Sequence, residues 1–408
     1  MRIMLINQYA GSPSLGMEFR PHSMARAWRN LGHHVLIVTG SYSHLRNAQP
    51  LRGIREVDGI NYLTVGTPTY HNNGAGRLAN IAWFRSRLFS RASELATWQP
   101  DVVIASSTHP MDVRPAAKIA KRAGAKFVFE VHDLWPLTPM LAAGVSARHP
   151  VIRWMQREED FGYSVADLVV SLLPGTEEYM QSRGLPVNRW AYIPNGYDSN
   201  MRPKRSVEKL KPLADIAAHY PIRILYTGTH SDLYPLRDLL DLNETAADLG
   251  IHLLLVGDGP SKSELVDEFR HCPNVAFLDR TPRRESLGLM CESDAGFAGL
   301  SQSPLLQYGV SPNKLYDYMS MKLPVIEYMN AFNSPTSEAK AGLCPDPNIP
   351  GSLASALEDL CDANSAQLRA WGANGHRYVR QLGYPALAAR FLTALETVAP
   401  SNVPHLRN

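Results

Sequence analysis

The sequence predicts an α/β protein built from two doubly wound, Rossmann-like domains. The chain has 408 residues, more than a domain with one hydrophobic core usually contains, which suggests two or three domains. Short apolar runs alternate with helical patterns along the whole chain, as in parallel sheets that helices cover on both faces. Turn-forming residues interrupt this alternation near residue 195, after which the same pattern restarts.

In the first half, buried strands alternate with amphipathic helices. The first helix is expected over residues 20–32, because Ala25, Trp28 and Leu31 recur at helical spacing. Further helices are expected near 113–123, 151–164 and 176–183. The strands are expected at 2–7, 35–39, 102–105, 127–131, 168–172 and 192–193.

The second domain is expected to begin after a turn-rich segment that runs from Pro194 to Pro203. Its strands are predicted at residues 222–226, 252–256, 275–278, 295–299 and 325–327. We therefore expect one domain over 1–200, joined by a C-terminal helix from about 385 that packs back on it, and another over 201–384. Two such units imply a ligand cleft at the carboxyl ends of both sheets.

The composition indicates a globular protein without a membrane span. No apolar run approaches the ~18–20 residues that a spanning helix needs. The short apolar stretch at Ile3–Ile6 indicates a buried strand and not a signal peptide, so a cytoplasmic location is expected. The four cysteines lie far from any His cluster and form no C-x-x-C pair. They are interpreted as reduced core thiols, and no metal site is expected.

Charge is distributed unevenly between the two halves. Residues 1–200 hold 21 Lys and Arg against 15 Asp and Glu, whereas the remainder holds 20 against 23. A basic first half suits an anionic surface or a phosphorylated substrate. The excess is too mild, and too poor in basic clusters with aromatic residues between them, to suggest nucleic acid.

The loop over residues 7–17 is the first candidate for chemistry. It follows the first strand and leads into the first helix. Gly11 and Gly16 would let backbone amides approach a phosphate, to which the helix adds its positive end. An ordinary strand-to-helix loop is the alternative.

A second candidate lies at residues 129–136, where Glu130, His132 and Asp133 end a buried strand. Ionisable groups beside an apolar strand are costly unless they are paired or used. A structural ion pair is the alternative.

A third candidate is the start of a helix after Pro312. Lys314 would occupy the first turn, which is unfavourable for the helix dipole unless an anion binds there. A diphosphate would supply that anion, and Asp317, one turn further along, would accept hydroxyl hydrogen bonds from a ribose. The alternative is a surface ion pair between these two residues. The nearby Gly257-Asp258-Gly259 turn lacks the third glycine of a dinucleotide fingerprint and is weak alone.

Together these segments resemble bacterial glycosyltransferase family 4, and the resemblance runs from Met1 to about Phe391. It is closest to the O-antigen and exopolysaccharide branch that contains fucosaminyl transferases. Five motifs of that branch occur in order, at residues 7–21, 130–136, 194–198, 256–260 and 303–319.

The resemblance implies a GT-B fold, a nucleotide-diphosphate-sugar donor (UDP favoured over GDP), retention at the anomeric carbon and no metal. Its implied acceptor is lipid-linked or a glycan in cell-envelope polysaccharide synthesis. The implied catalytic residues are His132, which would contact the donor sugar, and Asp133, which would lie toward the acceptor or orient His132. The implied donor site comprises Gly16, Thr229, His230, Asn313, Lys314, Leu315 and Asp317, and the implied acceptor side comprises Arg20, Glu130 and Trp135.

Two positions depart from the family pattern. The first strand of the second domain ends in Thr227–Asp232 without the usual Arg and Lys, and Tyr308 stands where an acidic residue is usual. A nucleotide-sugar 2-epimerase of the same fold and a catalytically idle nucleotide-sugar-binding protein therefore stay open as alternatives.

A helix over residues 77–98 places Arg85, Arg87 and Arg91 beside aromatic residues. This pattern suits peripheral docking on an anionic bilayer at the inner face of the plasma membrane. A solvated helix that packs its aromatic residues into its own core is the alternative.

Overall fold

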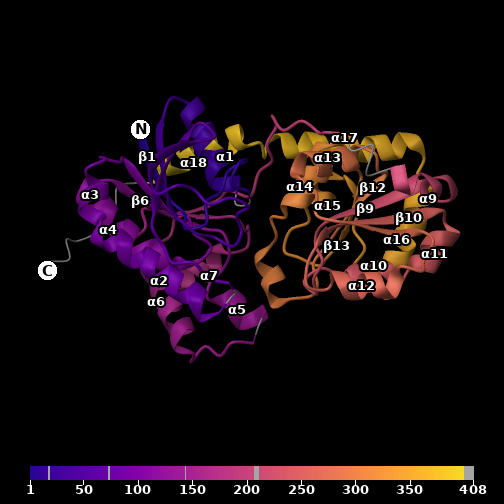
Figure 1. Cartoon of the computed structure of the whole chain (residues 1–408), viewed down its shortest axis with the longest axis horizontal. Coiled ribbons are helices and arrows are strands. Elements are labelled where there is room, and N and C mark those ends of the chain that lie inside the picture. The colour runs from indigo at the N-terminus through magenta and orange to yellow at the C-terminus, as the bar shows by residue number, and fades with distance from the viewer. Residues whose placement is uncertain (17–18, 72–73, 143, 206–210, 399–408) are drawn as a thin grey trace. The chain divides into compact units, whose positions relative to one another are not determined.

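The computed structural model describes residues 1–16, 19–71, 74–142, 144–205 and 211–398 (Figure 1). Met17 of the candidate loop lies outside these residues, as do residues 206–210 of the segment that follows Pro203. The chain divides into two compact units. The first comprises Met1–Asn195 and the segment that begins at Tyr384, and the second comprises Gly196–Gly383.

The first unit is built on an eight-stranded sheet in the order β3-β4-β2-β1-β5-β6-β7-β8. Every neighbouring pair is parallel except β3 and β4. The strands are β1 (Arg2–Ile6), β2 (His34–Gly40), β3 (Gly53–Val57), β4 (Ile60–Val65), β5 (Val102–Ala105), β6 (Lys126–Val131), β7 (Leu168–Ser171) and β8 (Trp190–Tyr192). The four central strands β2, β1, β5 and β6 are almost entirely buried, as a sheet covered on both faces requires.

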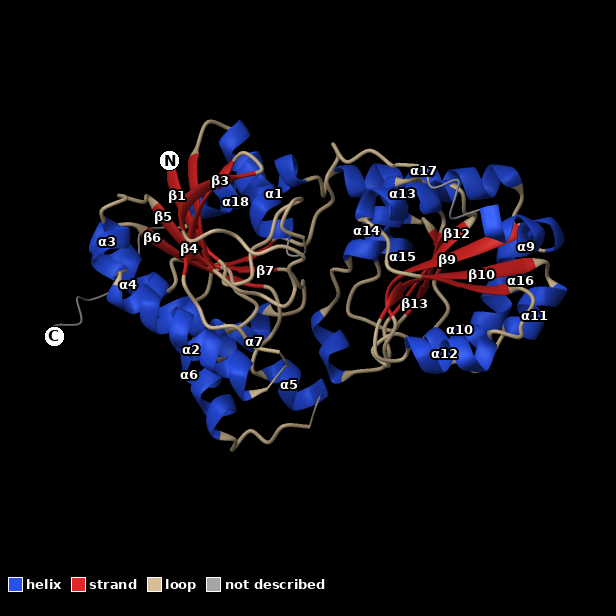
Figure 2. Ribbon diagram, viewed as in Figure 1, coloured by secondary structure: helices blue, strands red, loops and turns tan. Residues whose placement is uncertain are grey.

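Helices flank this sheet on both sides (Figure 2). They are α1 (Phe19–Asn30), α2 (Ala75–Ser90), α3 (Ala92–Ala96), η1 (Pro110–Asp112), α4 (Val113–Ala123), α5 (Leu137–Ala142), α6 (Pro150–Val165), α7 (Glu177–Ser182) and α18 (Tyr384–Thr397). The C-terminal helix α18 packs on α1. The rings of Trp28 and Phe391 lie 5.1 Å apart, and the Trp28 indole donates to the Ala388 carbonyl.

The second unit contains a six-stranded parallel sheet in the order β11-β10-β9-β12-β13-β14. Its strands are β9 (Ile222–Thr229), β10 (Ile251–Asp258), β11 (Val275–Leu278), β12 (Ala295–Gly299), β13 (Val325–Tyr328) and β14 (Gly342–Leu343). Its helices are η2 (Lys211–Leu213), α9 (Ala214–His219), α10 (Leu236–Leu240), α11 (Asn243–Asp248), α12 (Lys262–Phe269), α13 (Arg283–Cys291), η3 (Pro304–Tyr308), α14 (Asn313–Ser320), α15 (Pro335–Ala339), α16 (Ser352–Asp362) and α17 (Ser365–Arg380).

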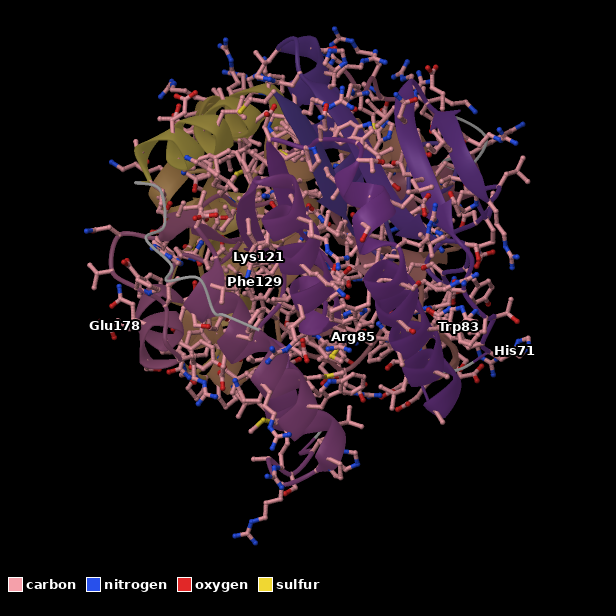
Figure 3. The ribbon with its side chains drawn as sticks, turned by 90° about the vertical axis from the view of Figure 1, so that its left-hand side faces the viewer. His71, Trp83, Arg85, Lys121, Phe129 and Glu178 are labelled. Carbon is pink, nitrogen blue, oxygen red and sulfur yellow. The ribbon has the colours of Figure 1, made fainter. Side chains whose placement is uncertain are left out.

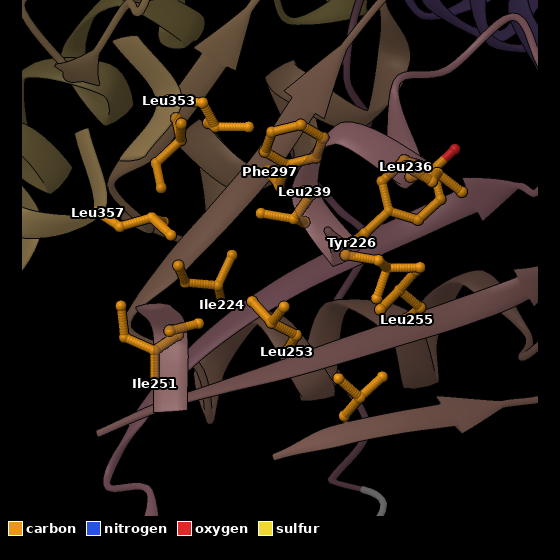
Figure 4. Packing of buried hydrophobic residues seen from close by; sticks show 14 of the residues in the cluster. Ile224, Tyr226, Leu236, Leu239, Ile251, Leu253, Leu255, Phe297, Leu353 and Leu357 are labelled. Atoms are coloured by element: carbon orange, nitrogen blue, oxygen red, sulfur yellow. The ribbon is translucent and has the colours of Figure 1, made fainter. Parts of the chain in front are cut away.

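Aliphatic side chains from β9, β10 and the helices beside them form the core of this unit (Figure 4). Tyr226 of β9 lies at one end of the cluster, and its hydroxyl oxygen points away from the apolar side chains. The core therefore holds the ring of Tyr226 while its polar end stays at the carboxyl edge of the sheet.

The predicted α/β class and the parallel strands are confirmed, but three strands were missed: the pair β3 and β4, and the two-residue strand β14. β3 is an exposed edge strand, so it lacks the apolar run that marks a buried strand. It joins β4 through Asp58 and Gly59, which both have positive φ. An Asp-Gly pair between two short strands is a hairpin signal that could have revealed it.

Two further expectations need correction. The helix expected over 77–98 breaks into α2 and α3 at Arg91, where Ser90 Oγ donates to the Arg87 carbonyl and competes with the helical bonding pattern. The cysteines are free thiols, but they are not all in the core, because Cys291 and Cys344 are exposed. Across the described residues, no helix is long and apolar enough to cross a membrane, and no cluster of side chains suited to holding a metal occurs.

Candidate functional site

The first turn of α14 carries Lys314, whose side chain rests on two tyrosine rings. Its Nζ donates to the Tyr226 hydroxyl at 2.9 Å. The same nitrogen lies 4.1 Å from the centre of the Tyr226 ring and 3.9 Å from that of Tyr234. Tyr226 Oη in turn donates to the Thr229 carbonyl at 2.6 Å. Aromatic faces attract cations, so this arrangement holds an ammonium group at the carboxyl end of β9.

Among the described residues, Lys314 has no carboxylate as counter-ion. Within the described part of the chain no carboxylate contacts it, and the i,i+3 pair with Asp317 considered from the sequence does not form. Burial lowers the pKa of Lys314 to about 7, because a charged amine is disfavoured away from water. A half-buried ammonium with no anionic partner is a ready binding point for an anion.

Two glycines shape the backbone beside this lysine. A Cβ on Gly228 would lie 2.8 Å from Lys314 Nζ, and a Cβ on Gly257 would lie 1.8 Å from the Gly228 carbonyl oxygen. Both glycines have φ near +150° (150° and 155°), which side chains rarely tolerate. The carboxyl ends of β9 and β10, where Gly228 and Gly257 are paired, can therefore approach each other only because these positions have no side chain.

His230 is fully buried at the carboxyl ends of these strands, and neither ring nitrogen has a hydrogen-bond partner among the residues that the structure describes. Burial, with the charge of Lys262, lowers its pKa to about 4, so the ring is neutral near pH 7. Unsatisfied buried polar groups are costly and are uncommon in folded proteins. The neutral His230 ring is therefore a second polar group, after the Lys314 ammonium, at this edge of the sheet.

Asp317 faces a different partner from Lys314. The Arg283 guanidinium donates to both oxygens of its carboxylate, at 2.6 Å and 3.2 Å. The two side chains line a pocket of about 120 Å³ with His376 and residues 197–203. Asp317 is thus a fixed hydrogen-bond acceptor at a small cavity.

The other residues assigned to the donor site differ in exposure. Asn313 and Thr229 are exposed. Leu315 is fully buried in the core, so its side chain is not available to a ligand. Gly16 belongs to the first unit, where its N–H already donates to the Ser12 carbonyl at 2.8 Å.

In the first unit, Arg20, Glu130, His132 and Ser106 form one buried cluster. Arg20 donates to Glu130 Oε1 through Nη2 at 2.8 Å and through Nε at 3.2 Å. Glu130 Oε2 lies 2.6 Å from Ser106 Oγ and 3.1 Å from His132 Nε2. The ion pair that the sequence left open at this strand end is therefore present, and it contacts the histidine.

The hydrogen-bonding partners of the His132 ring include Glu130 and Ser106. The resemblance implies that Asp133 either lies toward the acceptor or orients His132, and burial raises the pKa of its carboxyl group. Trp135, expected on the acceptor side, packs partly buried against the apolar cluster of Ile81, Met111 and Met155.

Sequence reasoning missed the polar residues that follow β5. Ser107 Oγ donates to Asp112 Oδ2 at 2.6 Å, and burial raises the pKa of Asp112 to about 7. His109 Nε2 lies 2.8 Å from Gln8 Oε1. The signal was present, because polar residues directly after a buried parallel strand lie at the same sheet edge as those after β6.

The proposed membrane-facing helix presents fewer free charges than expected. Phe84 is buried in the core, Arg85 pairs with Glu158 at 3.0 Å, and Arg91 pairs with Glu94 at 2.6 Å. Trp83 is 52% exposed and lies at the outline of the molecule in Figure 3, whereas Arg85 lies nearer the middle of that view. The large exposed side chains of α2 are thus Leu78, Trp83 and Arg87, of which only Arg87 is basic.

Comparisons with known proteins support one domain type and one fold. Residues 16–196 match the sequence model of the family described as "Glycosyl transferase 4-like domain". The chain has no significant match among curated protein sequences.

Three solved structures illustrate the structural likeness. Sucrose-phosphate synthase from Thermosynechococcus elongatus has a TM-score of 0.73 at 16% identity, over 97% of this chain and 98% of that one. Anabaena HepE in complex with UDP-glucose has a TM-score of 0.65 at 16% identity, over 97% and 100%. WaaG, a glycosyltransferase involved in lipopolysaccharide biosynthesis, has a TM-score of 0.66 at 14% identity, over 98% and 100%. The fold is therefore GT-B, and the sequence of residues 16–196 is similar to the glycosyl transferase 4-like domain.

Proposed function

We propose that this GT-B protein is a retaining glycosyltransferase that moves a sugar from a nucleotide-diphosphate-sugar, with UDP favoured, onto a lipid-linked or glycan acceptor of a cell-envelope polysaccharide. The glycosyl transferase 4-like domain at residues 16–196 supports transfer chemistry. Anabaena HepE, which has a similar fold, was solved with UDP-glucose, and this supports the donor class. WaaG, which also has a similar fold, is involved in lipopolysaccharide biosynthesis, and this supports the envelope role. In this proposal the second unit binds the donor and the first unit binds the acceptor.

The observation that carries the proposal is the Lys314 ammonium, which is held on two tyrosine rings without a carboxylate among the described residues. Sugar transfer places negative charge on the departing diphosphate. A fixed cation at that point stabilises the transition state more than the ground state. Lys314 would neutralise the diphosphate, and the polar atoms of Thr229 and His230 would lie beside it.

Further residues take the roles that the sequence resemblance implies. Asp317, held by Arg283, would accept hydrogen bonds from the ribose hydroxyls. His132 would contact the sugar near the reacting carbon, with Asp133 toward the acceptor. Retention would follow from attack and departure on the same face of the sugar, which needs no metal when cationic groups stabilise the leaving diphosphate.

Isothermal titration with UDP-glucose tests the donor site. Lys314→Met should weaken binding roughly 10- to 100-fold, because a charge-assisted hydrogen bond contributes about 1.5–3 kcal/mol. Lys211→Met, at an exposed lysine of the same unit, is the matched control and should bind normally. Equal affinities in the wild type and Lys314→Met would refute the donor assignment.

Binding of the sugar nucleotide should also depend on pH. The pKa of Lys314 in the unliganded protein is about 7, and a bound diphosphate would raise it. Affinity should be full below pH 7 and fall as pH rises above it, by up to about tenfold per unit. UDP-glucose is the appropriate probe, since its diphosphate carries no phosphomonoester that titrates at about pH 6.

Product analysis separates transfer from the alternatives. NMR of the sugar released or transferred from UDP-glucose should show the α-anomeric configuration of the donor. Conversion of the donor to a 2-epimer without transfer or hydrolysis would contradict the proposal in favour of an epimerase. Binding without any turnover, across UDP- and GDP-sugars and lipid-linked acceptors, would instead indicate an idle binding protein.

Peripheral membrane binding is the less supported part of the proposal. It depends on Trp83 and Arg87, the exposed aromatic and basic residues of α2. The double variant Trp83→Ala, Arg87→Glu should reduce flotation with vesicles that contain anionic lipid. Arg122→Glu, an exposed basic residue at the end of α4, is the control. Unchanged flotation of the double variant would remove this surface as the docking site.

A further inference from the structure

Arg283 holds the Asp317 carboxylate at two points in the second unit. Its Nη2 donates to Asp317 Oδ1 at 2.6 Å, and its Nε donates to Asp317 Oδ2 at 3.2 Å. A guanidinium that meets a carboxylate through two parallel hydrogen bonds fixes the orientation of that carboxylate as well as its position. The Asp317 side chain, which is only 13% exposed, is therefore oriented before any ligand binds.

Helix α13, which begins at Arg283, is itself anchored to a segment near the start of the second unit. The Lys204 N–H donates to the Arg284 carbonyl at 2.8 Å, and Arg284 Nε donates to the Arg202 carbonyl at 3.1 Å. A Cβ on Gly288 would lie 2.1 Å from the Lys204 carbonyl oxygen, so the two backbones are in close contact. The Arg283 side chain therefore extends from a fixed base.

The two hydrogen bonds from Arg283 decide which lone pairs of Asp317 stay available. Each carboxylate oxygen offers two lone pairs, and the guanidinium takes the one that each oxygen directs forward, away from the side chain. One lone pair remains at the outer side of each oxygen, and these two point apart in the carboxylate plane. A hydroxyl can reach either oxygen from its side, but two adjacent hydroxyls cannot face both oxygens at once.

A bound ribose should leave this ion pair in place. Separating the two side chains would leave a largely buried carboxylate without a cation, which is strongly unfavourable, and the hydroxyls of a sugar are neutral and cannot replace the charge. Both side chains line the pocket of about 120 Å³. A water molecule needs about 10–15 Å³ of such space, so one edge of a ribose fits beside the intact pair.

We propose that Arg283 is a positioning residue that restricts Asp317 to a single hydroxyl of the donor ribose. The proposal rests on the proposed function, from which it takes the contact between Asp317 and the ribose. It adds a specificity, because binding should depend through Asp317 on only one of the 2′- and 3′-hydroxyls. Without Arg283 the forward lone pairs become available, and the carboxylate can accept from both adjacent hydroxyls together.

Isothermal titration of the full chain with UDP, 2′-deoxy-UDP and 3′-deoxy-UDP tests this restriction, because the three probes share the same base and diphosphate. In the wild type, one of the two deoxy analogues should lose roughly 10- to 100-fold in affinity through Asp317, as is typical of a lost hydrogen bond to a charged group. Asp317→Ala should abolish the loss for that analogue and leave the affinity ratio of UDP to the other analogue unchanged.

Arg283→Met should spread the dependence on Asp317 over both hydroxyls, as measured by adding Asp317→Ala to this variant. Arg283→Lys keeps the positive charge but cannot donate from two fixed points, so it should lose the selectivity for one hydroxyl in the same way. Arg270→Met removes an exposed arginine of the same unit and is the matched control. It should show the affinities of the wild type for all three probes.

A wild type in which both analogues depend on Asp317 would overturn the proposal, as would unchanged selectivity in a folded Arg283→Met or Arg283→Lys protein. An arginine with a merely structural role would lower all three affinities by the same factor and leave their ratios unchanged. If Arg283→Met does not fold, the wild type and Arg283→Lys still decide.

The same titrations separate this proposal from the proposed function. If Asp317→Ala changes the loss for neither analogue, Asp317 does not contact the ribose, and the ribose assignment of the proposed function fails together with this proposal. If one or both losses depend on Asp317 but do not respond to Arg283, the ribose assignment stands and only the role of Arg283 is refuted.

Discussion

Replacing Lys314 with methionine should stabilise the unliganded protein while it weakens donor binding. Burial lowers the pKa of Lys314 from its ordinary value of 10.5 to about 7. At about 1.4 kcal/mol per pH unit, this displacement corresponds to a cost of about 5 kcal/mol for the charged side chain. The faces of Tyr226 and Tyr234 offset about 1 kcal/mol each. A net gain of about 3 kcal/mol is therefore expected for Lys314→Met.

The gain should depend on pH in a defined direction. Below pH 7, Lys314 is charged in both the folded and the unfolded chain, so the full cost is present. Between pH 7 and 10.5 the unfolded chain binds more protons than the folded one, and the stability of the wild type rises with pH. The difference between variant and wild type should therefore be largest at pH 6.5 and shrink toward pH 10.

Urea unfolding of the full chain at pH 6.5, 8.0 and 9.5 measures this difference, with both proteins compared at each pH. Lys211→Met removes an exposed lysine from the same unit and should change stability by less than about 0.5 kcal/mol at every pH. A Lys314→Met protein that is no more stable than the wild type at pH 6.5 would refute the view that this ammonium is held at a cost. A gain that does not change with pH would refute the electrostatic explanation.

Two other predictions concern folding. Gly257→Ala should destabilise the protein by at least about 2 kcal/mol, because its Cβ would lie 1.8 Å from the Gly228 carbonyl oxygen. Gly351→Ala is the control, because Gly351 also has positive φ but has open space around it, and this substitution should cost less stability. Equal losses of stability in thermal melts of the two variants would contradict the packing argument. Burial raises the pKa of Glu159 to about 7 from 4.5, so its stabilising contribution is full below pH 4.5 and is lost as pH rises through 7. Glu159→Gln stays neutral, so its stability relative to the wild type should rise by about 3 kcal/mol from pH 4.5 to 8, and a constant difference in urea unfolding would show that Glu159 does not titrate in this range.

Local patterns were sufficient for most of the fold. The strands at 102–105, 275–278 and 295–299 were predicted at their observed limits, because a short apolar run bounded by turns can bury itself only as an interior strand. Pro312 likewise marked the start of α14 correctly, since proline suits helix starts. The edge strand β3 escaped because its residues face solvent, and the sequence period carries little information where neither face is buried.

The candidate site was also predicted only in part. The sequence identified four site residues, Lys314, Asp317, Glu130 and His132. They were identified because an ionisable group beside an apolar strand end or at a helix start is costly unless it has a partner or a function. The sequence could not supply their partners. The lysine meets Tyr226, 88 positions away, and Glu130 meets Arg20, 110 positions away.

The sequence alone therefore predicted most of the buried strands and the helices beside them, and which residues carry charge at their ends. Only the tertiary structure decided that Lys314 and Asp317, one turn apart, take different partners, and that His132 shares a carboxylate with Arg20. The physical reason is that periodicity is a local property, whereas the pairing of a buried charge depends on which strands become neighbours in the sheet. That order is fixed by packing across the whole unit.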